Sequence, residues 1–309
     1  MFRASLLYLS EQPQVFKFVR SNALAKKFAS RFVAGETLDT AVAAVRELNA
    51  RKISASLDLL GESVSTRDEA QQAADTAIRM LERIAADRLD ANISVKLTQF
   101  GLDLDPAQCI ANATRILERA RALDIFVRID MESSAYTERT LDLVEKSLYP
   151  QFPKHVGVVV QSYLYRTRED VPRLIDLGMR VRLCKGAYKE PPSVAYPAKA
   201  DVDKAYADLM EALIERGTYP GIATHDEALI ARARGFVGSR KIPAERFEFQ
   251  MLYGVRRDLQ DMLVEAGFRM RVYVPFGTQW YPYLMRRLAE RPANIAFILG
   301  NVVKEGLRR

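Results

Sequence analysis

The alternation of two kinds of segment from Ile53 onward constrains the fold most strongly. Short runs rich in Val, Ile and Leu alternate with segments of helical periodicity, and the sequence holds eight of each. Strand followed by helix, repeated eight times over about 240 residues, predicts an α/β fold, a (β/α)8 barrel of the TIM type. A doubly wound open sheet is second choice, because no glycine-rich phosphate loop follows the first strand. The strands are expected at Ile53–Leu60, Ile93–Thr98, Phe126–Asp130, Val156–Gln161, Arg180–Lys185, Gly221–Thr224, Phe247–Leu252 and Arg269–Val274.

The helices between these strands have recognisable starts. Thr66 and Glu69 form a capping-box pattern, and Pro106 after Asp105 suits the first turn of the next helix. The long connection Tyr188–Ala200 contains three prolines and is expected to be an ordered active-site loop. Further helices are expected at Thr137–Leu148, Thr167–Leu177, Asp201–Arg216, Glu227–Val237, Asp258–Ala266 and from Pro282 to about Pro292.

The first fifty residues show helical patterns without strand candidates. In the segment Pro13–Val33, basic residues fall on one side of a helix, and Phe and Ala side chains fall on the other. Packing of this apolar side on the barrel is favoured over contact with a membrane surface. We therefore expect one domain overall, with residues 1–50 as additional N-terminal helices and residues 51–309 as the barrel.

Scarce cysteine and histidine limit the chemistry. Cys109 and Cys184 offer no disulfide framework and no thiolate metal site, and His155 and His225 are too few for a histidine cluster. No metal centre is therefore expected. The sequence also lacks a Gly-x-Ser-x-Gly elbow and a Cys/His pair, so hydrolysis by a nucleophile or a metal has no support.

The net charge of +7 favours an anionic partner, such as an anionic cofactor, a negative membrane face or nucleic acid. Nucleic acid is the weakest of these, because aromatic residues are not interleaved with basic ones and no DNA-binding motif is present. No apolar run approaches the roughly 18–20 residues that cross a bilayer, and the N-terminus lacks a signal-peptide cleavage pattern. A cytoplasmic location is therefore expected.

Polar residues follow the predicted strands at the end where a barrel places its active site. Core packing alone does not explain them, because a lone buried charge is costly unless it is paired or hydrated. We therefore expect a basic, hydrogen-bonding floor suited to an anionic cofactor. The segments are Leu60–Glu62, Lys96–Gln99, Arg128–Glu132, Gln161–Tyr163, Arg182–Gly186, Thr224–Asp226 and Gln250–Tyr253.

Other functions stay open for the same residues. Glu132 and Asp226 can instead bond loop backbone, and Lys185 can simply neutralise Asp130. The floor would also suit a Schiff-base aldolase or lyase that uses Lys96 or Lys185. The non-enzymatic alternative is a basic barrel that binds anionic lipid or nucleic acid.

The last predicted helix carries a polar cluster. Tyr283, Arg287 and Glu290 fall on one side of it, with Arg286 beside them. The two arginines could grip a substrate carboxylate through forked, charge-assisted hydrogen bonds. A solvated helix is the alternative, but the aromatic neighbours are costly to leave in water and favour a ligand-facing helix.

Several strings resemble the proline dehydrogenase family, flavoenzymes that oxidise L-proline to 1-pyrroline-5-carboxylate. They are SVKLTQFG, VRIDME, VVVQSYLYRT, VRLCKGAYKEP, ATHD, FEFQMLYGVR and YVPFGTQWYPYLMRRLAERP. The resemblance runs from Ala34 to Pro292 in the expected order, and the length is similar to that of the compact monofunctional bacterial form.

The resemblance implies an FAD cofactor across the strand ends and L-proline as the substrate. Asp130 and Arg182 match catalytic positions, with Arg182 near flavin N5, while Gly186 is implied to let the backbone approach the cofactor closely. The matching cofactor positions are Met131, Gln161, Arg182, Lys185, Gly186, Ala187, Thr224 and His225. The matching substrate positions are Lys96, Leu252, Tyr273, Tyr283, Arg286, Arg287 and Glu290.

The resemblance further implies hydride transfer from proline C5 to flavin N5 and reoxidation by a membrane quinone. It suggests peripheral contact with the inner face of the membrane, and 1-pyrroline-5-carboxylate dehydrogenase as the next enzyme. Cys184 stands where an aliphatic residue is expected, and no redox role is assigned to it. As a hypothesis, Glu62 pairs with Arg286 when proline is absent and acts as a gate.

Overall fold

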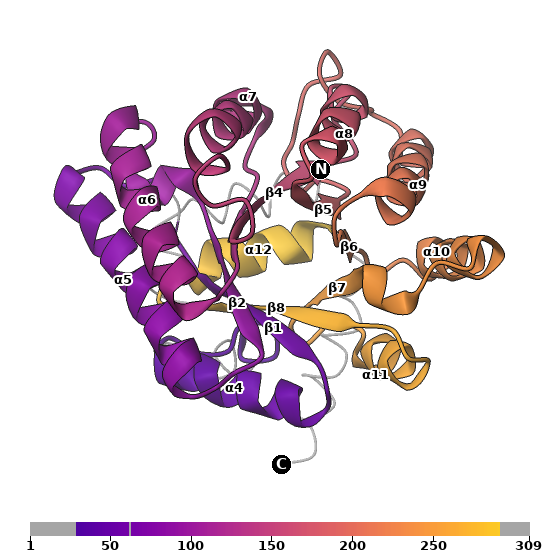
Figure 1. Ribbon diagram of the computed structural model, residues 1–309, viewed down its shortest axis with the longest axis horizontal. Helices are drawn as coiled ribbons and strands as arrows, with labels where there is room; N and C mark the ends of the chain where they lie inside the picture. The colour runs from indigo at the N-terminus through magenta and orange to yellow at the C-terminus, as the bar shows by residue number, and fades with distance from the viewer. Residues whose placement is uncertain (1–28, 62, 291–309) are drawn as a thin grey trace, which may run out of the picture.

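The computed structural model describes residues 29–61 and 63–290, with residues 286–290 as backbone only. It forms a closed barrel of parallel strands in sequential order, with helices around it (Figure 1). The predicted (β/α)8 barrel is therefore confirmed. The strands are β1 Ser54–Leu59, β2 Ala91–Val95, β3 Val127–Ile129, β4 Val156–Gln161, β5 Arg180–Cys184, β6 Gly221–Ala223, β7 Glu248–Leu252 and β8 Met270–Phe276.

Two helices begin where the capping signals predict, α5 directly after Thr66 and α6 at Pro106. The Glu69 backbone N–H donates to the Thr66 hydroxyl at 3.2 Å, which completes the predicted capping box. No helix within residues 29–61 and 63–290 is long and apolar enough to span a membrane. The helices are α4 Leu38–Ala50, α5 Arg67–Ala86, α6 Pro106–Leu123, α7 Ser134–Leu143, α8 Thr167–Asp176, α9 Lys199–Arg216, α10 Glu227–Arg240, α11 Arg257–Glu265 and α12 Trp280–Glu290.

The N-terminal part of the chain is described from residue 29 onward, so most of the predicted helix Pro13–Val33 lies outside the described residues. Helix α4 packs against β1 and β8. Its buried side chains Ala41, Val45 and Leu48 join the core around the barrel.

The prediction for the second strand was wrong at its end. The strand stops at Val95 rather than Thr98, and Leu97–Phe100 forms a 3-10 turn. The Gln99 side chain explains the turn, because its Oε1 accepts from the Lys96 backbone N–H at 3.1 Å while its Nε2 donates to the carbonyls of Leu59 and Gly61 at the end of β1 and just after it. The helix expected at Thr137–Leu148 begins earlier, at Ser134 in α7, and its last turn, Val144–Leu148, is π-helical.

The two faces of the strands differ in chemistry. Alternate residues point to opposite faces, and one set is apolar, including Leu57, Ile93 and Val272, all of them fully buried in the core. The other set is polar. Contacts between these side chains across the barrel show that they point into its interior. Arg182 Nη1 on β5 donates to the Ser94 hydroxyl on β2 at 3.3 Å, although these two strands are not neighbours. The interior is thus polar, where such barrels usually hold branched apolar residues.

A buried ion pair joins the last two strands near their amino ends. Arg271 Nε of β8 lies 2.7 Å from Glu248 Oε1 of β7, and Arg271 Nη1 donates to the Ala55 carbonyl of β1 at 2.7 Å. Burial acts to raise the pKa of Glu248, but the adjacent Arg271 guanidinium outweighs it and holds the pKa below its ordinary value. The pair therefore links β7, β8 and β1, where the barrel closes.

Glu248→Gln should lower the free energy of unfolding by about 3–5 kcal/mol near neutral pH, because it leaves Arg271 buried without a charge partner. Urea unfolding measures the difference from the unchanged protein. Because the folded-state pKa of Glu248 is lowered, the pair contributes stability above the ordinary value of 4.5 and loses it as the pH falls through the folded pKa. The difference should therefore shrink in acid; a difference that stays constant would contradict this explanation.

Candidate active site

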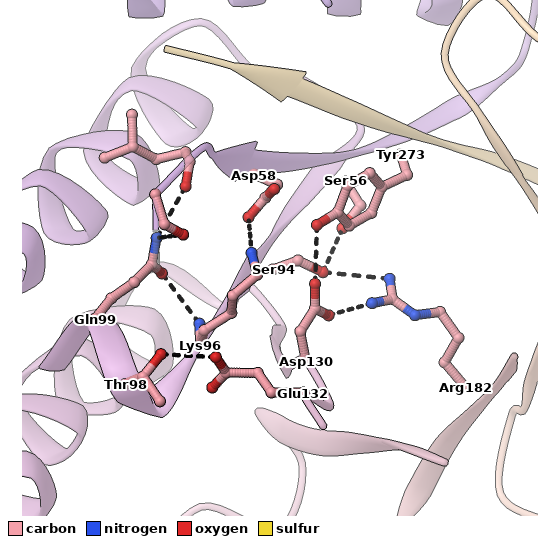
Figure 2. Close-up of polar contacts among 12 residues, drawn as sticks. Ser56, Asp58, Ser94, Lys96, Thr98, Gln99, Asp130, Glu132, Arg182 and Tyr273 are labelled. Atoms are coloured by element: carbon pink, nitrogen blue, oxygen red, sulfur yellow. Dashed lines mark hydrogen bonds and ion pairs between the residues drawn. The ribbon is translucent and has the colours of Figure 1, made fainter. Parts of the chain in front are cut away.

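The centre of the candidate site is the Asp130 carboxylate, directly after β3 (Figure 2). Its Oδ1 forms an ion pair with Arg182 of β5, and its Oδ2 accepts from the Tyr273 hydroxyl of β8 at 2.9 Å. The Arg182 guanidinium also lies over the Tyr273 ring, 5.3 Å from its centroid. Three strands that are distant in the sequence thus meet at one carboxylate.

Burial and charge fix the protonation of Arg182 and Tyr273. Burial acts to lower the pKa of Arg182, but the Asp130 carboxylate outweighs it and raises the pKa above its ordinary value. Burial, together with Asp130, raises the pKa of Tyr273 well above its ordinary value. At neutral pH the arginine is therefore a cation, and the tyrosine is a neutral hydroxyl that donates.

A second buried pair lies beside the first. Lys96 Nζ contacts Asp58 Oδ1 at 3.0 Å, and the two residues are 8% and 1% exposed. Burial acts to lower the pKa of Lys96, but the carboxylates of Asp58 and Asp130 outweigh it and raise the pKa above its ordinary value. Lys96 is therefore a permanent cation near Asp130.

Asp58 is a site residue that sequence reasoning missed. Asp58 lies inside β1, away from the strand ends and the last helix, where the sequence pattern predicts site residues. A signal was present, because Asp58 is the lone carboxylate in the apolar run Ile53–Leu60 and has the same strand parity as Ser56. Ser56 points into the barrel, where its hydroxyl lies 3.2 Å from the Ser94 hydroxyl of β2.

Lys185, after β5, has partners other than the one suggested from the sequence. Its Nζ lies 2.5 Å from Asp203 Oδ1 and 2.9 Å from Asp226 Oδ2. The suggestion that Lys185 neutralises Asp130 was therefore wrong. Asp226 also bonds backbone, as suggested, since its Oδ1 accepts from the Ala228 N–H at the start of α10 at 3.1 Å.

The residues after β2, β3 and β4 are held to one another at the same rim. The Thr98 hydroxyl donates to Glu132 Oε1 at 2.8 Å, so the Glu132 carboxylate binds a side chain. Gln161 Nε2 donates to the Glu132 carbonyl at 2.9 Å. Met131, which directly precedes Glu132, is buried in the core.

The segment after β6 is also joined to the end of β7. The Asp226 backbone N–H donates to the Thr224 hydroxyl at 3.1 Å, and the Leu252 backbone N–H donates to His225 Nε2 at 2.9 Å. Because Nε2 accepts, the His225 ring carries its proton on Nδ1 in the neutral form. These contacts fix the ring of His225 at the edge of the barrel.

The backbone conformation and the surroundings of Gly186 both require glycine at this position. Its φ of +114° lies in the left-handed region, and a Cβ there would overlap the Tyr163 ring. The neighbouring Ala187 is half-buried. The shape of the chain at Gly186 is therefore set by Tyr163 as well as by anything bound there.

The loop after β5 is ordered, as predicted for Tyr188–Ala200. Ala195 forms a β-bridge with Leu164, and the Glu190 carboxylate accepts from the Ser134 backbone N–H at 2.7 Å at the start of α7. The loop is thus tied to two segments at the carboxyl-terminal end of the barrel.

Helix α12 lies across the barrel, inside the ring of the other helices (Figure 1). Its Trp280, Tyr281 and Tyr283 are buried together with Leu60, which follows β1, so the helix covers the carboxyl-terminal end. The predicted helix is confirmed, with Pro282 in its first turn. The side chains of Arg286, Arg287 and Glu290 and the whole of Glu62 lie outside the described residues.

The site suits a cofactor that offers hydrogen-bond acceptors. Arg182 Nε is buried without a partner in the described part of the chain, which is costly unless an acceptor binds there. Amide, ammonium and hydroxyl groups of Gln161, Lys185 and Thr224 stand at the ends of consecutive strands. Among the residues described, no group of three or more His, Cys, Asp or Glu side chains could hold a metal ion.

A closed (β/α)8 barrel with buried ion pairs at the carboxyl ends of its strands is the architecture of a TIM-barrel enzyme. The family model described as Proline dehydrogenase matches residues 41–299. The chain belongs to the proline dehydrogenase family and is an oxidoreductase of proline metabolism.

Relatives of known name agree with this assignment. The chain is 41% identical over 305 residues to Proline dehydrogenase 1 of Bacillus subtilis, covering 99% of this chain and 100% of that protein. It is 40% identical over 308 residues to Proline dehydrogenase of Deinococcus radiodurans, covering 98% of each. The crystal structure of proline utilization A (PutA) from Bdellovibrio bacteriovorus, inactivated by N-propargylglycine, superposes with a TM-score of 0.81 and 26% identity, over 86% of this chain and 33% of that one.

Gly186→Ala should lower the free energy of unfolding by about 1–3 kcal/mol or more, because alanine is strained at this φ and its Cβ displaces the Tyr163 ring. Urea unfolding measures the loss. Gly235→Ala in α10 is the matched control: a Cβ there meets nothing within 4 Å, and alanine should stabilise the helix by about 0.5–1 kcal/mol. Equal effects of the two substitutions would refute the role given to Tyr163.

Proposed function

We propose that this chain oxidises L-proline to 1-pyrroline-5-carboxylate with FAD as its cofactor, the first step of proline degradation to glutamate. The observation that carries the proposal is the buried cluster in which the Lys96 and Arg182 cations share the Asp130 carboxylate as a neighbour. Identity of about 40% over the whole chain to named proline dehydrogenases supports it.

Lys96 is proposed to hold the proline carboxylate. Its raised pKa keeps it charged, and at 8% exposure it faces little competing water. Tyr273, Leu252 and Tyr283 would wall the pyrrolidine ring. On the resemblance alone, Arg286 and Arg287 of α12 would complete the grip on the carboxylate, with Glu290 orienting them, and Glu62 would act as the gate.

Asp130 is proposed to position Arg182 rather than to act as a free base, because both of its oxygens already accept from Arg182 and Tyr273. The pocket also selects the form of the substrate. Burial in this site disfavours the charged form of the proline amine, so the pKa of the amine falls on binding and the neutral amine is favoured. Only the neutral amine can release a hydride from the neighbouring carbon.

The residues proposed to hold FAD stand at or just after the carboxyl ends of β3, β4, β5 and β6, and among them Arg182 has a buried Nε without a partner in the described residues. When bound, FAD supplies at its N5 an acceptor for the hydride that leaves proline C5. Arg182 would donate to the flavin, and the other contacts would come from Met131, Gln161, Lys185, Gly186, Ala187, Thr224 and His225.

A membrane quinone is the proposed final electron acceptor, and 1-pyrroline-5-carboxylate dehydrogenase is the proposed enzyme that consumes the product. The basic sequence, with a net charge of +7, supports a peripheral encounter of a cytoplasmic protein with the anionic inner face of the membrane.

A Schiff-base lyase is disfavoured by the state of both lysines. A lysine that attacks a carbonyl must be neutral, which requires a lowered pKa. The pKa of Lys96 is instead raised, and Lys185 is held by the carboxylates of Asp203 and Asp226.

The purified protein should show flavin absorption at about 450 nm that bleaches when L-proline is added without oxygen. The visible spectrum before and after addition is the measurement. A colourless protein that FAD does not reconstitute, and that borohydride links covalently to a carbonyl substrate, would overturn the proposal in favour of the lyase.

Lys96→Met should raise the KM for proline about ten- to hundredfold and leave the flavin content unchanged, because it removes one charged contact to the substrate carboxylate. Steady-state kinetics and the ratio of flavin to protein absorbance measure the two effects. Lys146→Met is the control, since Lys146 is exposed and pairs with Asp142 on the surface. An unchanged KM in Lys96→Met would remove Lys96 from the substrate site.

A further inference from the structure

A second charged cluster lies inside the barrel at the amino ends of the strands, opposite to the active site. Arg128 of β3 is 2% exposed, Arg180 begins β5 and is half-buried, and Arg271 of β8 is buried. Each of the first two stands two residues before an active-site group, Arg128 before Asp130, which directly follows β3, and Arg180 before Arg182 on β5. The two clusters therefore form successive layers of one barrel interior.

The charges of this cluster do not balance. Glu248 is occupied by Arg271 at 2.7 Å, by Gln250 Nε2 at 2.6 Å and by the Tyr219 hydroxyl at 3.1 Å. Within the described ranges, neither Arg128 nor Arg180 forms an ion pair with any carboxylate. Arg128 Nη1 donates only to the main chain, to the carbonyls of Val158 and Arg180. The layer thus buries more positive charge than negative charge.

Burial is the main reason that the pKa of Arg128 lies well below its ordinary range, and the guanidiniums of Arg182 and Arg180 add to it. An arginine in a protein keeps its proton, so the cost remains in the folded state unless an anion offsets it. A bound anion is the direct way to remove this cost.

The surroundings of the Arg180 guanidinium suit it to bind a hydrogen-bond acceptor. It lies against the Phe126 ring at 4.0 Å and the Tyr219 ring at 4.6 Å, measured to the centroids. These stacking contacts leave the edge of the guanidinium for hydrogen bonds, and its Nε is buried without a partner in the residues described. Such an orphaned donor calls for an acceptor.

Tyr219 links this donor to the solvent. Its φ of 45° is a left-handed conformation that costs a non-glycine residue energy, so the surroundings must hold it there. In this conformation its ring also contacts Arg269, whose Nη1 donates to the Tyr219 hydroxyl at 3.2 Å. Arg269 is exposed, so the cluster continues from the buried Arg128 to the surface.

We propose that Arg128, Arg180 and Arg269, together with Tyr219, bind a small oxyanion such as inorganic phosphate at the amino-terminal mouth of the barrel. The planar guanidinium fork matches the oxygens of such an anion better than a spherical halide. The site is separate from the proposed function, because it lies at the other end of the strands. Bound anion would neutralise the excess charge beneath Asp130 and Arg182.

The first test is thermal unfolding of the FAD-saturated protein in phosphate and in chloride of equal ionic strength. Phosphate at about tenfold its dissociation constant should raise the Tm by about 2 °C more than chloride does. Arg180→Gln should abolish this increment. Arg115→Gln should keep it, because this substitution removes the same charge from an exposed pair between Arg115 of α6 and Asp75 of α5. An increment that survives in Arg180→Gln would overturn the proposal.

The second test uses the unchanged protein and decides the matter even if Arg180→Gln fails to fold. Crystals grown with selenate should show an anomalous selenium peak within hydrogen-bonding distance of the Arg180 guanidinium. A well-ordered barrel mouth with no such peak, or with peaks only at the opposite end of the barrel, would refute the site.

Discussion

Burying charge inside a closed barrel is the constraint on which this structure depends. Each ion taken from water must find a partner or remain costly, and the interior of this barrel holds several. The pairs Glu248–Arg271, Asp130–Arg182 and Lys96–Asp58 meet this demand. Each pair joins residues that lie in or directly after different strands, so the same contacts that make the charges tolerable also fix how the strands stand relative to one another.

Strand parity separates stability from chemistry. Residues facing the helices are apolar and supply the hydrophobic core, while alternate residues face inward and supply the charges. The inward-facing side chains, which alternate along each strand, can therefore be substituted without removing apolar area from the core. The division also explains why Arg180 and Arg182, two residues apart on β5, serve opposite ends of one interior.

The sequence predicted the barrel well and the pairing within it poorly. The strand Val156–Gln161 was predicted to the residue, because hydrophobic runs and turn signals are local. The second strand was predicted too long, because its end depends on hydrogen bonds from Gln99 to the carbonyls of Leu59 and Gly61 at the end of β1 and just after it. The partners of Lys185 were wrong for a related reason: α9 and the end of β6 supply them, and no local pattern announces a contact across such separations.

The protonation states at the rim decide what kind of chemistry the chain can perform. Lys96 is held as a cation by Asp58, and both oxygens of Asp130 are engaged by donors. A fixed cation attracts a carboxylate but cannot attack a carbonyl, and a carboxylate with both oxygens engaged by donors orients those donors. Among the residues described, this central group is thus a frame that binds and orients rather than a set of reacting groups. On the proposed function, the electron acceptor is a bound cofactor, and the charges of this group place the substrate against it.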